Sequence, residues 1–301
     1  MKKKTILSKI KVITTVASWP EALGLQRAAL SKYLAEEFEL IGIIDTPTQP
    51  GPYNLWDINL RSNAVKIAKE ICDRTIVVPE EIHLNRSKLF RETKEPSGSN
   101  ANLRAADSLQ FAYNYEILEN FEKILILDND MFPISNFSWE KEMREKFCKS
   151  VVHQSKGKFT QRKIDYLWSG LMFLDASTMP YKNEWSFDCG KIKGIRVDVS
   201  GQTYHWYKKI KQNNLESGFE AISHLPSLQW SANDLTKAFS QELIEFIIND
   251  DRNINSNFYT EFYNNSFIHF RAGSNWNKES ALIVKNRIKN FTSSLTRHIN
   301  L

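Results

Sequence analysis

The stretch that organises this sequence is ILILDNDMFP, at residues 124–133. Four consecutive aliphatic residues are typical of a buried strand. Asp128 and Asp130 follow this apolar run directly, and Pro133 ends the segment. Because side chains two positions apart lie on the same side of an extended chain, both carboxylates can face one ligand.

Two carboxylates at this spacing favour a divalent cation. Hard oxygen donors suit Mg²⁺ or Mn²⁺, and these ions can in turn bridge the oxygens of a diphosphate. The alternative is a turn in which both aspartates accept hydrogen bonds from nearby backbone amides. An Asp-x-Asp triplet alone has little weight, but its place directly after a buried strand favours the metal site.

Strand-like and helix-like segments alternate on the N-terminal side of this stretch. We expect strands at 11–17, 40–44, 75–78 and 123–127, and helices at 23–38, 64–71 and 103–120. This alternation predicts an α/β fold with a parallel sheet and right-handed crossovers. Ligands of such sheets bind outside the carboxyl ends of the strands, where Asp45 and the Asp128–Asp130 pair are expected to lie.

The second half of the chain is less regular. We expect strands at 166–174 and 266–270, and helices at 201–212, 232–248 and 281–298. The segment 141–163 is dense in Lys and Arg with few apolar residues, which predicts a mobile excursion over the surface. We find no internal repeat and no low-complexity linker.

Composition narrows the class of protein. The 301 residues are 42% hydrophobic and carry a formal net charge of +5. This balance suits a small anionic substrate and excludes the dense basic stripe of a duplex binder. The segment 141–163 also lacks the interleaved aromatics of a single-strand binder, so no nucleic acid partner is expected.

Targeting features are few. The cysteines at positions 72, 148 and 189 form neither a disulfide framework nor a zinc site, which favours a reducing compartment. No signal peptide and no transmembrane segment of about 18–20 apolar residues is recognised. We therefore expect a cytoplasmic protein, although the lysines at positions 2–4 leave loose membrane association open.

A second chemical signal is FIHFRAGSNWNK, at residues 267–278. A short strand presents His269, and Arg271 and Lys278 flank a turn of small residues. The imidazole could complete a metal shell, and either cation could neutralise phosphate. A histidine near a strand end is more often structural, but its combination with the Asp128–Asp130 pair favours a ligand.

The apolar strand that ends in Asp-Asn-Asp resembles the metal site of the GT-A fold glycosyltransferases. The segment His-x-x-x-Gly-x-x-Trp resembles a variant of the His-x-x-Gly-x-x-Lys-Pro-Trp segment of glycogenin-like members. This resemblance implies a GT-A (Rossmann-like) central, mostly parallel sheet flanked by helices, with a smaller antiparallel part in the second half. It implies that His269 binds the metal beside Asp128 and Asp130. The sequence has one extra residue before Gly273, so the phosphate contact is left open among Arg271, Asn275 and Lys278.

The order of elements follows the same resemblance over most of the chain. It implies a single domain, 1–301, in which 1–133 binds the nucleotide sugar and 134–301 binds the acceptor. The strand 168–173 is similar to one that carries donor-sugar or acceptor contacts. Further expected donor contacts, beyond those named above, are Thr14, Ser18, Asp45, Asn102, Arg104, Asn129 and Gly273. The ordinary alternatives are that Asp45 caps a turn and that Arg104 is a solvated helix charge.

Two further carboxylates are candidates for catalysis. Asp198 precedes a small-residue turn and could position or deprotonate an acceptor hydroxyl; Asp234 is in a similar setting. Both could equally be helix N-terminal signals. Four tryptophans could stack on a sugar, although buried tryptophan is usually part of a core; they are Trp168, Trp206, Trp230 and Trp276.

The predicted function is therefore metal-dependent glycosyl transfer. With Mn²⁺ or Mg²⁺, a sugar would move from a nucleotide-diphosphate sugar, by default a UDP-sugar, to a hydroxyl of a glycan or other acceptor. The glycogenin-like resemblance favours retention of configuration. One alternative is a sugar-phosphate nucleotidyltransferase, but residues 17–21 lack the Gly-rich basic loop of that class. The other is a non-catalytic nucleotide- or carbohydrate-binding module.

Overall fold

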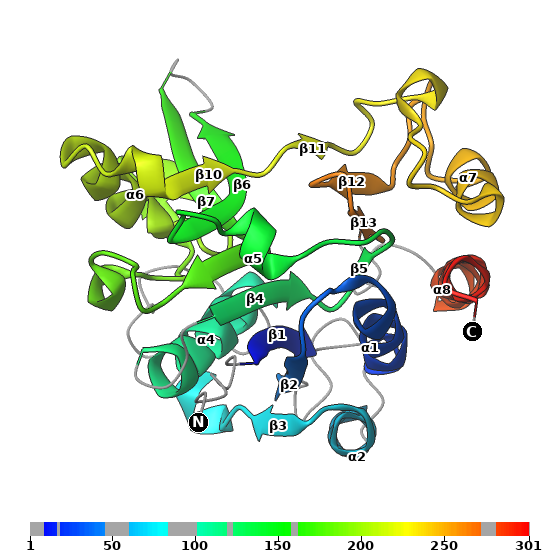
Figure 1. Ribbon diagram of the computed structural model, residues 1–301, viewed down its shortest axis with the longest axis horizontal. Coiled ribbons are helices and arrows are strands. Elements are labelled where there is room, and N and C mark those ends of the chain that lie inside the picture. Colours follow the sequence, from blue (N-terminus) through cyan, green and yellow to red (C-terminus); the bar gives the residue numbers. More distant parts are fainter. Residues whose placement is uncertain are drawn as a thin grey trace, which may run out of the picture.

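The computed structural model describes residues 9–16, 19–45, 60–83, 101–118, 123–157, 162–271 and 281–300 (Figure 1). A seven-stranded sheet forms its centre, in the order β10-β6-β7-β4-β1-β2-β3. In chain order, these strands are β1 (Ile10–Val16), β2 (Phe38–Ile44), β3 (Arg74–Val77), β4 (Lys123–Asp128), β6 (Cys148–Lys156), β7 (Lys163–Asp175) and β10 (Phe219–Ala221).

The sheet is mixed but mostly parallel. Strands β3, β2, β1 and β4 are parallel to one another, β7 is antiparallel to β4 and to β6, and β10 is parallel to β6. The predicted α/β fold with a mostly parallel central sheet is thus confirmed. Asp128 is the last residue of β4, so its carboxylate lies at the carboxyl end of the parallel part.

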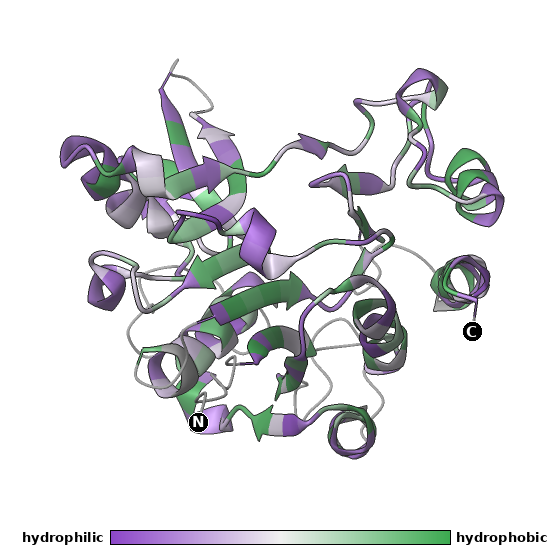
Figure 2. Cartoon of the chain, in the orientation of Figure 1, coloured by the Kyte–Doolittle hydropathy of each residue, from purple (hydrophilic) through white to green (hydrophobic). Residues whose placement is uncertain are grey.

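Helices cover both faces of the sheet, and the alternation of aliphatic side chains explains why. Leu125 and Leu127 pack in one core with α1 (Ala22–Tyr33) and α2 (Leu60–Ile71). Ile124 and Ile126 point the other way, into a core shared with α4 (Ala101–Ala112) and α6 (Thr203–Gln212). The hydrophobic colouring of β4 in Figure 2 reflects this burial on both faces.

A four-stranded antiparallel sheet lies beside the end of β4. Its order is β11-β12-β13-β5, with the bounds β5 (Met131–Pro133), β11 (His224–Leu225), β12 (Glu261–Tyr263) and β13 (Phe267–His269). Phe132, Ile268 and Phe270 pack with α7 (Gln241–Ile248) and α8 (Ala281–His298) in a third core. The predicted antiparallel part is therefore present. Strand β5, from the first 133 residues, lies in this sheet, whereas β6, β7 and β10, from the later residues, lie in the central sheet. Each sheet therefore combines strands from both parts of the chain.

The remaining described elements are short. A π-helical turn extends α4 at Tyr113–Ile117, and 3-10 turns occur at Lys182–Glu184, Glu216–Gly218 and Ala232–Asp234. The other elements are α5 (Trp139–Glu142) and a hairpin of β8 (Gly190–Ile192) with β9 (Ile195–Val197). No described helix combines the length and the apolarity needed to cross a bilayer.

Two expected helices are shorter in the structure. The helix expected at 23–38 ends at Tyr33, because Leu34 is extended and Phe38 begins β2. The helix expected at 232–248 is a 3-10 turn followed, after a break, by α7. Ser240 caps α7 by accepting a hydrogen bond from the backbone amide of Leu243, which begins a new helix there.

The prediction of a mobile excursion at 141–163 is wrong for most of that segment. Residues 148–156 form β6, which pairs with β7 inside the central sheet. Lys149 is buried there, with its Nζ 2.5 Å from Glu142 and 2.7 Å from Glu220. The positive charge that suggested a surface loop is compensated within the fold.

The three cysteines lie in the described residues as buried free thiols. Burial raises the pKa of Cys72 to about 12, so its thiol is protonated at neutral pH. Burial also raises the pKa of the Cys148 thiol far above its usual range. These environments favour a packing role over nucleophilic chemistry.

Candidate metal centre

The turn between β4 and β5 holds the two aspartates in place. Gln26, fully buried on α1, donates from Nε2 to the carbonyl oxygens of Asp128 (2.9 Å) and Met131 (3.0 Å). Asn129 donates from its side-chain amide to the carbonyl oxygen of Trp19 at 2.6 Å. These bonds connect the turn to the region between β1 and α1. Asn129 thus has a local structural contact, and its expected donor contact stays a prediction.

His269 reaches this turn through the antiparallel sheet. In the pairing of β13 with β5, His269 lies opposite Met131, and the Phe270 amide donates to the carbonyl oxygen of Asp130 at 2.9 Å. The imidazole Nε2 lies 3.2 Å from Oδ1 of Asp130. Ligand atoms of Asp128, Asp130 and His269 all lie within 4.8 Å of one another. The structure therefore brings together the three residues expected to bind metal.

The electrostatics of this cluster show an excess of negative charge. Burial raises the pKa of Asp128 to about 7, and the Asp130 carboxylate adds to this rise. Burial lowers the pKa of His269, but the Asp130 and Glu261 carboxylates outweigh it and raise that pKa to about 10. Two carboxylate oxygens and one imidazole nitrogen, crowded at a buried point, form a donor set that fits Mg²⁺ or Mn²⁺.

Glu261 is a site residue that the motifs in the sequence do not predict, and it lies directly opposite His269 in the pairing of β12 with β13. His269 Nδ1 is 2.8 Å from Oε2 of Glu261. Burial raises the pKa of Glu261, but hydrogen bonding to His269 outweighs it, and the pKa falls to about 2. The signal that could have found this residue is the β12–β13 hairpin, since Asn264 and Asn265 adopt the positive φ of a tight turn.

Aromatic rings form a wall beside the three candidate ligands. Trp168 of β7 stacks on His153 (5.1 Å between ring centroids) and on Tyr263 (5.4 Å). Its ring also lies 5.4 Å from that of His269, and His224 stacks on Tyr263 at 5.3 Å. Trp168 is half-buried, whereas Trp206 and Trp230 are core residues. Of the described tryptophans proposed for sugar stacking, Trp168 is the one that lies beside the candidate metal ligands.

The two candidate catalytic carboxylates differ in their surroundings. Asp198 is exposed, and its charge contributes to the raised pKa of Asp128, so it lies near the cluster. Asp234 takes part in a capping box with Ser231, whose backbone amide donates to its carboxylate at 2.8 Å. Asp234 thus has the structural contact that the sequence left open as an alternative, and a catalytic role for either residue stays a prediction.

The expected donor contacts near the first strands are largely buried. Arg104 on α4 lies 3.1 Å from the Asp45 carboxylate and 2.9 Å from Glu80, so it is part of a buried ion-pair network. Thr14 is fully buried in β1, whereas Asn102 is exposed on α4. The donor-binding roles of these residues stay predictions.

The second expected phosphate segment is only partly described. Arg271 is exposed, with its Nε 3.7 Å from Oε1 of Glu261. Its guanidinium therefore lies close to the candidate metal site. Ser18, Gly273, Asn275, Trp276 and Lys278 lie outside the described residues.

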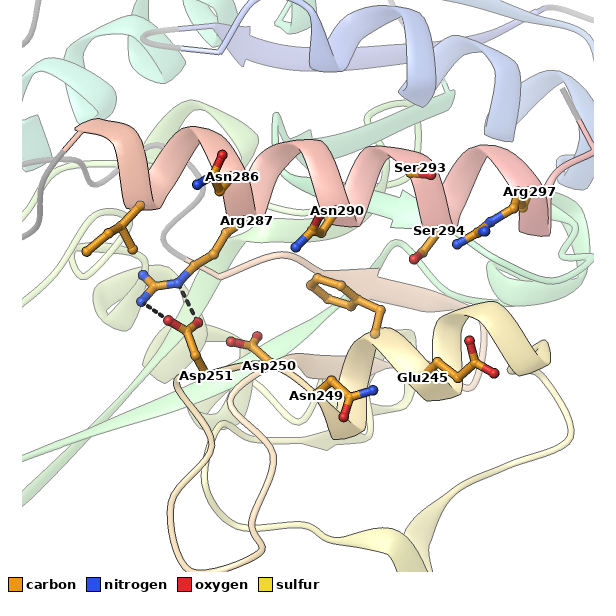
Figure 3. Close-up of a pocket in the computed structure, with 12 residues that line it drawn as sticks. Glu245, Asn249, Asp250, Asp251, Asn286, Arg287, Asn290, Ser293, Ser294 and Arg297 are labelled. Atoms are coloured by element: carbon orange, nitrogen blue, oxygen red, sulfur yellow. Dashed lines mark hydrogen bonds and ion pairs between the residues drawn. The ribbon is translucent and has the colours of Figure 1, made fainter.

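A separate groove of about 500 Å³ lies between α7 and α8 (Figure 3). Its lining combines amide, hydroxyl and charged side chains with Phe246 and Ile283, and includes an ion pair between Arg287 and Asp251 at 2.6 Å. Phe246 from this groove packs on Phe270, the residue that follows His269. The contact of Phe246 with Phe270 thus connects the groove to the candidate metal site, but the lining includes none of the candidate ligands.

Comparison with known proteins gives structural matches only. No family model and no curated protein matches this sequence. Among solved structures, an active-site mutant of the galactosyltransferase LgtC matches with a TM-score of 0.41 at 10% identity, over 94% of this chain and 96% of that one. Core-mannan synthase A from Aspergillus fumigatus, in a Mn/GDP form, matches with a TM-score of 0.34 at 10% identity, over 58% of this chain and 61% of that one.

A third match is the bifunctional glycosyltransferase WbbM, with a TM-score of 0.34 at 7% identity and 60% of this chain covered. The match spans only 34% of the WbbM chain. LgtC and WbbM are thus named as glycosyltransferases, and the second match is named as a mannan synthase.

Proposed function

We propose that this protein is a metal-dependent glycosyltransferase that moves a sugar from a nucleotide-diphosphate sugar to a hydroxyl acceptor. The observation that carries this proposal is the convergence of Asp128, Asp130 and His269 at the carboxyl end of β4. These side chains come from two separate segments, and their ligand atoms lie within 4.8 Å of one another. That edge of a parallel sheet is also where nucleotides bind in α/β folds.

The three side chains would hold Mn²⁺ or Mg²⁺ through one atom each. Such an ion supplies positive charge that stabilises a departing diphosphate. Arg271, exposed beside Glu261, would neutralise further phosphate charge. Asn275 and Lys278 remain expected contacts in the same segment.

The base and ribose of the donor and the acceptor would contact different parts of the chain. Residues 1–133 would bind the nucleotide, with Thr14, Ser18 and Asp45 near the base and ribose, and UDP is the default. Residues 134–301 would bind the acceptor. The half-buried face of Trp168 lies beside the cluster and would give the sugar an apolar surface.

Asp198 is the candidate base for the acceptor hydroxyl. It is exposed and close enough to the cluster to influence the pKa of Asp128. A base at this position would take a proton from the incoming hydroxyl in an inverting reaction. A retaining reaction does not need it, so the Asp198→Asn variant separates the two.

The test is thermal unfolding with UDP, GDP, CDP or ADP, each with and without Mn²⁺, for the wild type, Asp130→Asn and Asp198→Asn. Ligand at a hundred times its dissociation constant stabilises a protein by roughly 2.7 kcal/mol. We expect a rise for one diphosphate only with Mn²⁺, present in Asp198→Asn and absent in Asp130→Asn. No response to any diphosphate in the wild type would overturn the proposal.

Activity then separates the alternatives. A metal-dependent response with transfer or hydrolysis of the matching nucleotide sugar supports the glycosyltransferase. Binding without turnover would indicate a non-catalytic module. Pyrophosphate release from a nucleoside triphosphate and a sugar phosphate would indicate a nucleotidyltransferase.

A further inference from the structure

Glu261, His269 and the turn that carries Asp130 lie in a row across the antiparallel sheet. Glu261 pairs with His269 between β12 and β13, and His269 pairs with Met131 between β13 and β5. Adjacent strands lie about 4.8 Å apart, so directly opposed side chains touch. The strand pairing itself places a carboxylate behind the imidazole, on the side away from Asp130.

We propose that Glu261 is a positioning residue for metal binding, which holds His269 with a proton on Nδ1 and the Nε2 lone pair directed at the site between Asp128 and Asp130. This inference rests on the proposed function, because it assigns a role at the same cation site. His269 Nδ1 lies 2.8 Å from Glu261 Oε2, while Nε2 lies 3.2 Å from Asp130. The two ring nitrogens therefore face different partners, and the carboxylate determines which one is left to bind the ion.

Glu261 is itself held by three neighbours. Tyr263 donates from its hydroxyl to Oε2 at 2.7 Å, and the Ser227 amide donates to Oε1 at 3.3 Å. Arg271 lies 3.7 Å from Oε1. Glu261 is only 8% exposed, so its carboxylate is fixed by these contacts.

Packing also limits rotation of the imidazole. Trp168 and Tyr263 lie 5.4 Å and 6.1 Å from the His269 ring, and they stack on each other. These contacts resist movement of the ring out of its plane, and a flip of the ring within that plane would lose the contact of Nδ1 with Glu261. The Glu261 bond and the aromatic packing thus select the same orientation.

The chemistry predicts what an amide would do in place of the carboxylate. The carboxylate of Glu261 only accepts hydrogen bonds, so it favours the tautomer with hydrogen on Nδ1. A glutamine can donate from its NH₂ group to Nδ1, which moves the proton to Nε2 and removes the ligand lone pair. Changes to such partners lower metal affinity by roughly 10- to 100-fold.

The test measures Mn²⁺ affinity by isothermal titration calorimetry on the full chain without nucleotide. The variants are Glu261→Gln, Tyr263→Phe and, as a matched control, Glu220→Gln, which removes a strand carboxylate that pairs with Lys149. We expect a loss of about 10- to 100-fold for Glu261→Gln, a smaller loss for Tyr263→Phe and no change for Glu220→Gln. Near-UV circular dichroism in EDTA checks that each variant is folded.

A spectroscopic readout distinguishes positioning from a merely structural role. Long-range ¹H–¹⁵N spectra of the wild type with Mg²⁺ should show the His269 proton on Nδ1. If the proton is on Nε2, or if Glu261→Gln binds Mn²⁺ as tightly as the wild type, the inference is wrong while the proposed function stands. If the wild type binds neither ion, the metal-dependent function fails and the inference with it.

Discussion

Gln26 on α1 donates hydrogen bonds to the backbone carbonyl oxygens of both Asp128 and Met131, at 2.9 Å and 3.0 Å. A buried amide from the first helix therefore holds both ends of the turn that carries the aspartates. The Asp130 carboxylate of the same turn lies 3.2 Å from His269 Nε2.

The first prediction follows from this clamp. In Gln26→Leu the two carbonyls lose their donor, which should lower the free energy of unfolding by about 1–3 kcal/mol. The turn would loosen, so Mn²⁺ affinity should also fall. Urea unfolding and calorimetry measure the two effects. Gln154→Leu, at an exposed glutamine on β6, should change neither quantity. A Mn²⁺ affinity in Gln26→Leu equal to that of the wild type would contradict this role of the Gln26 hydrogen bonds.

The second prediction concerns the pH dependence of metal binding. The pKa of His269 is raised to about 10 and that of Asp128 to about 7. At pH 8 the ion therefore displaces mainly the His269 proton, and below pH 7 it also displaces a proton from Asp128. Mn²⁺ affinity should fall from pH 8 to pH 6 and fall more steeply below pH 7. Calorimetry in two buffers of different ionisation enthalpy counts the released protons, and none released at pH 8 would contradict the prediction.

The third prediction concerns His153. Burial lowers the pKa of His153 to about 4, below the ordinary value of about 6.5. The unfolded chain therefore binds a proton on His153 more tightly than the folded chain does. The contribution of neutral His153 to the free energy of unfolding is fully present above pH 6.5 and is lost as the pH falls towards 4. His153 alone accounts for at most about 3 kcal/mol of this loss.

The His153→Phe variant keeps a ring on Trp168 but cannot take up the proton. The difference in unfolding free energy between wild type and variant should therefore move in favour of the variant between pH 6.5 and pH 4. Urea unfolding at half-unit pH steps measures it. A difference that stays constant with pH would show that His153 is not buried in its neutral form.

The fourth prediction concerns β6. In Lys149→Ala, Glu142 and Glu220 lose their shared cation, which should cost about 1–3 kcal/mol of stability. Arg144→Ala, at an exposed position in the same basic segment, should stay within about 0.5 kcal/mol of the wild type. Equal stability of the two variants would mean that Lys149 contributes no more than a surface charge.

Local patterns were sufficient for β4 and for the last helix. The aliphatic run before Asp128 predicted β4, because alternate residues must be buried on two faces of a sheet. The final helix was predicted at 281–298, and the structure has it at the same residues. Its apolar positions recur at helical spacing whatever lies opposite them.

Partners that are distant in the sequence account for the errors. The density of Lys and Arg in the segment 141–163, with few apolar residues, predicts a mobile surface excursion, although most of the segment is structured. Glu220, which pairs with Lys149, lies 71 residues further on, and no local pattern connects the two. Glu261 was missed for the same reason, since its importance depends on which strand pairs with which.

The sequence by itself determined the α/β class, the strand that carries Asp128 and the kinds of side chain available for a cation. These depend on hydrophobic spacing and on the chemistry of single residues. Only the tertiary structure decided that Glu261 stands behind His269, that Gln26 clamps the turn and that Trp168 lies beside the cluster. These relationships depend on strand register and helix packing, which follow from burial over the whole chain.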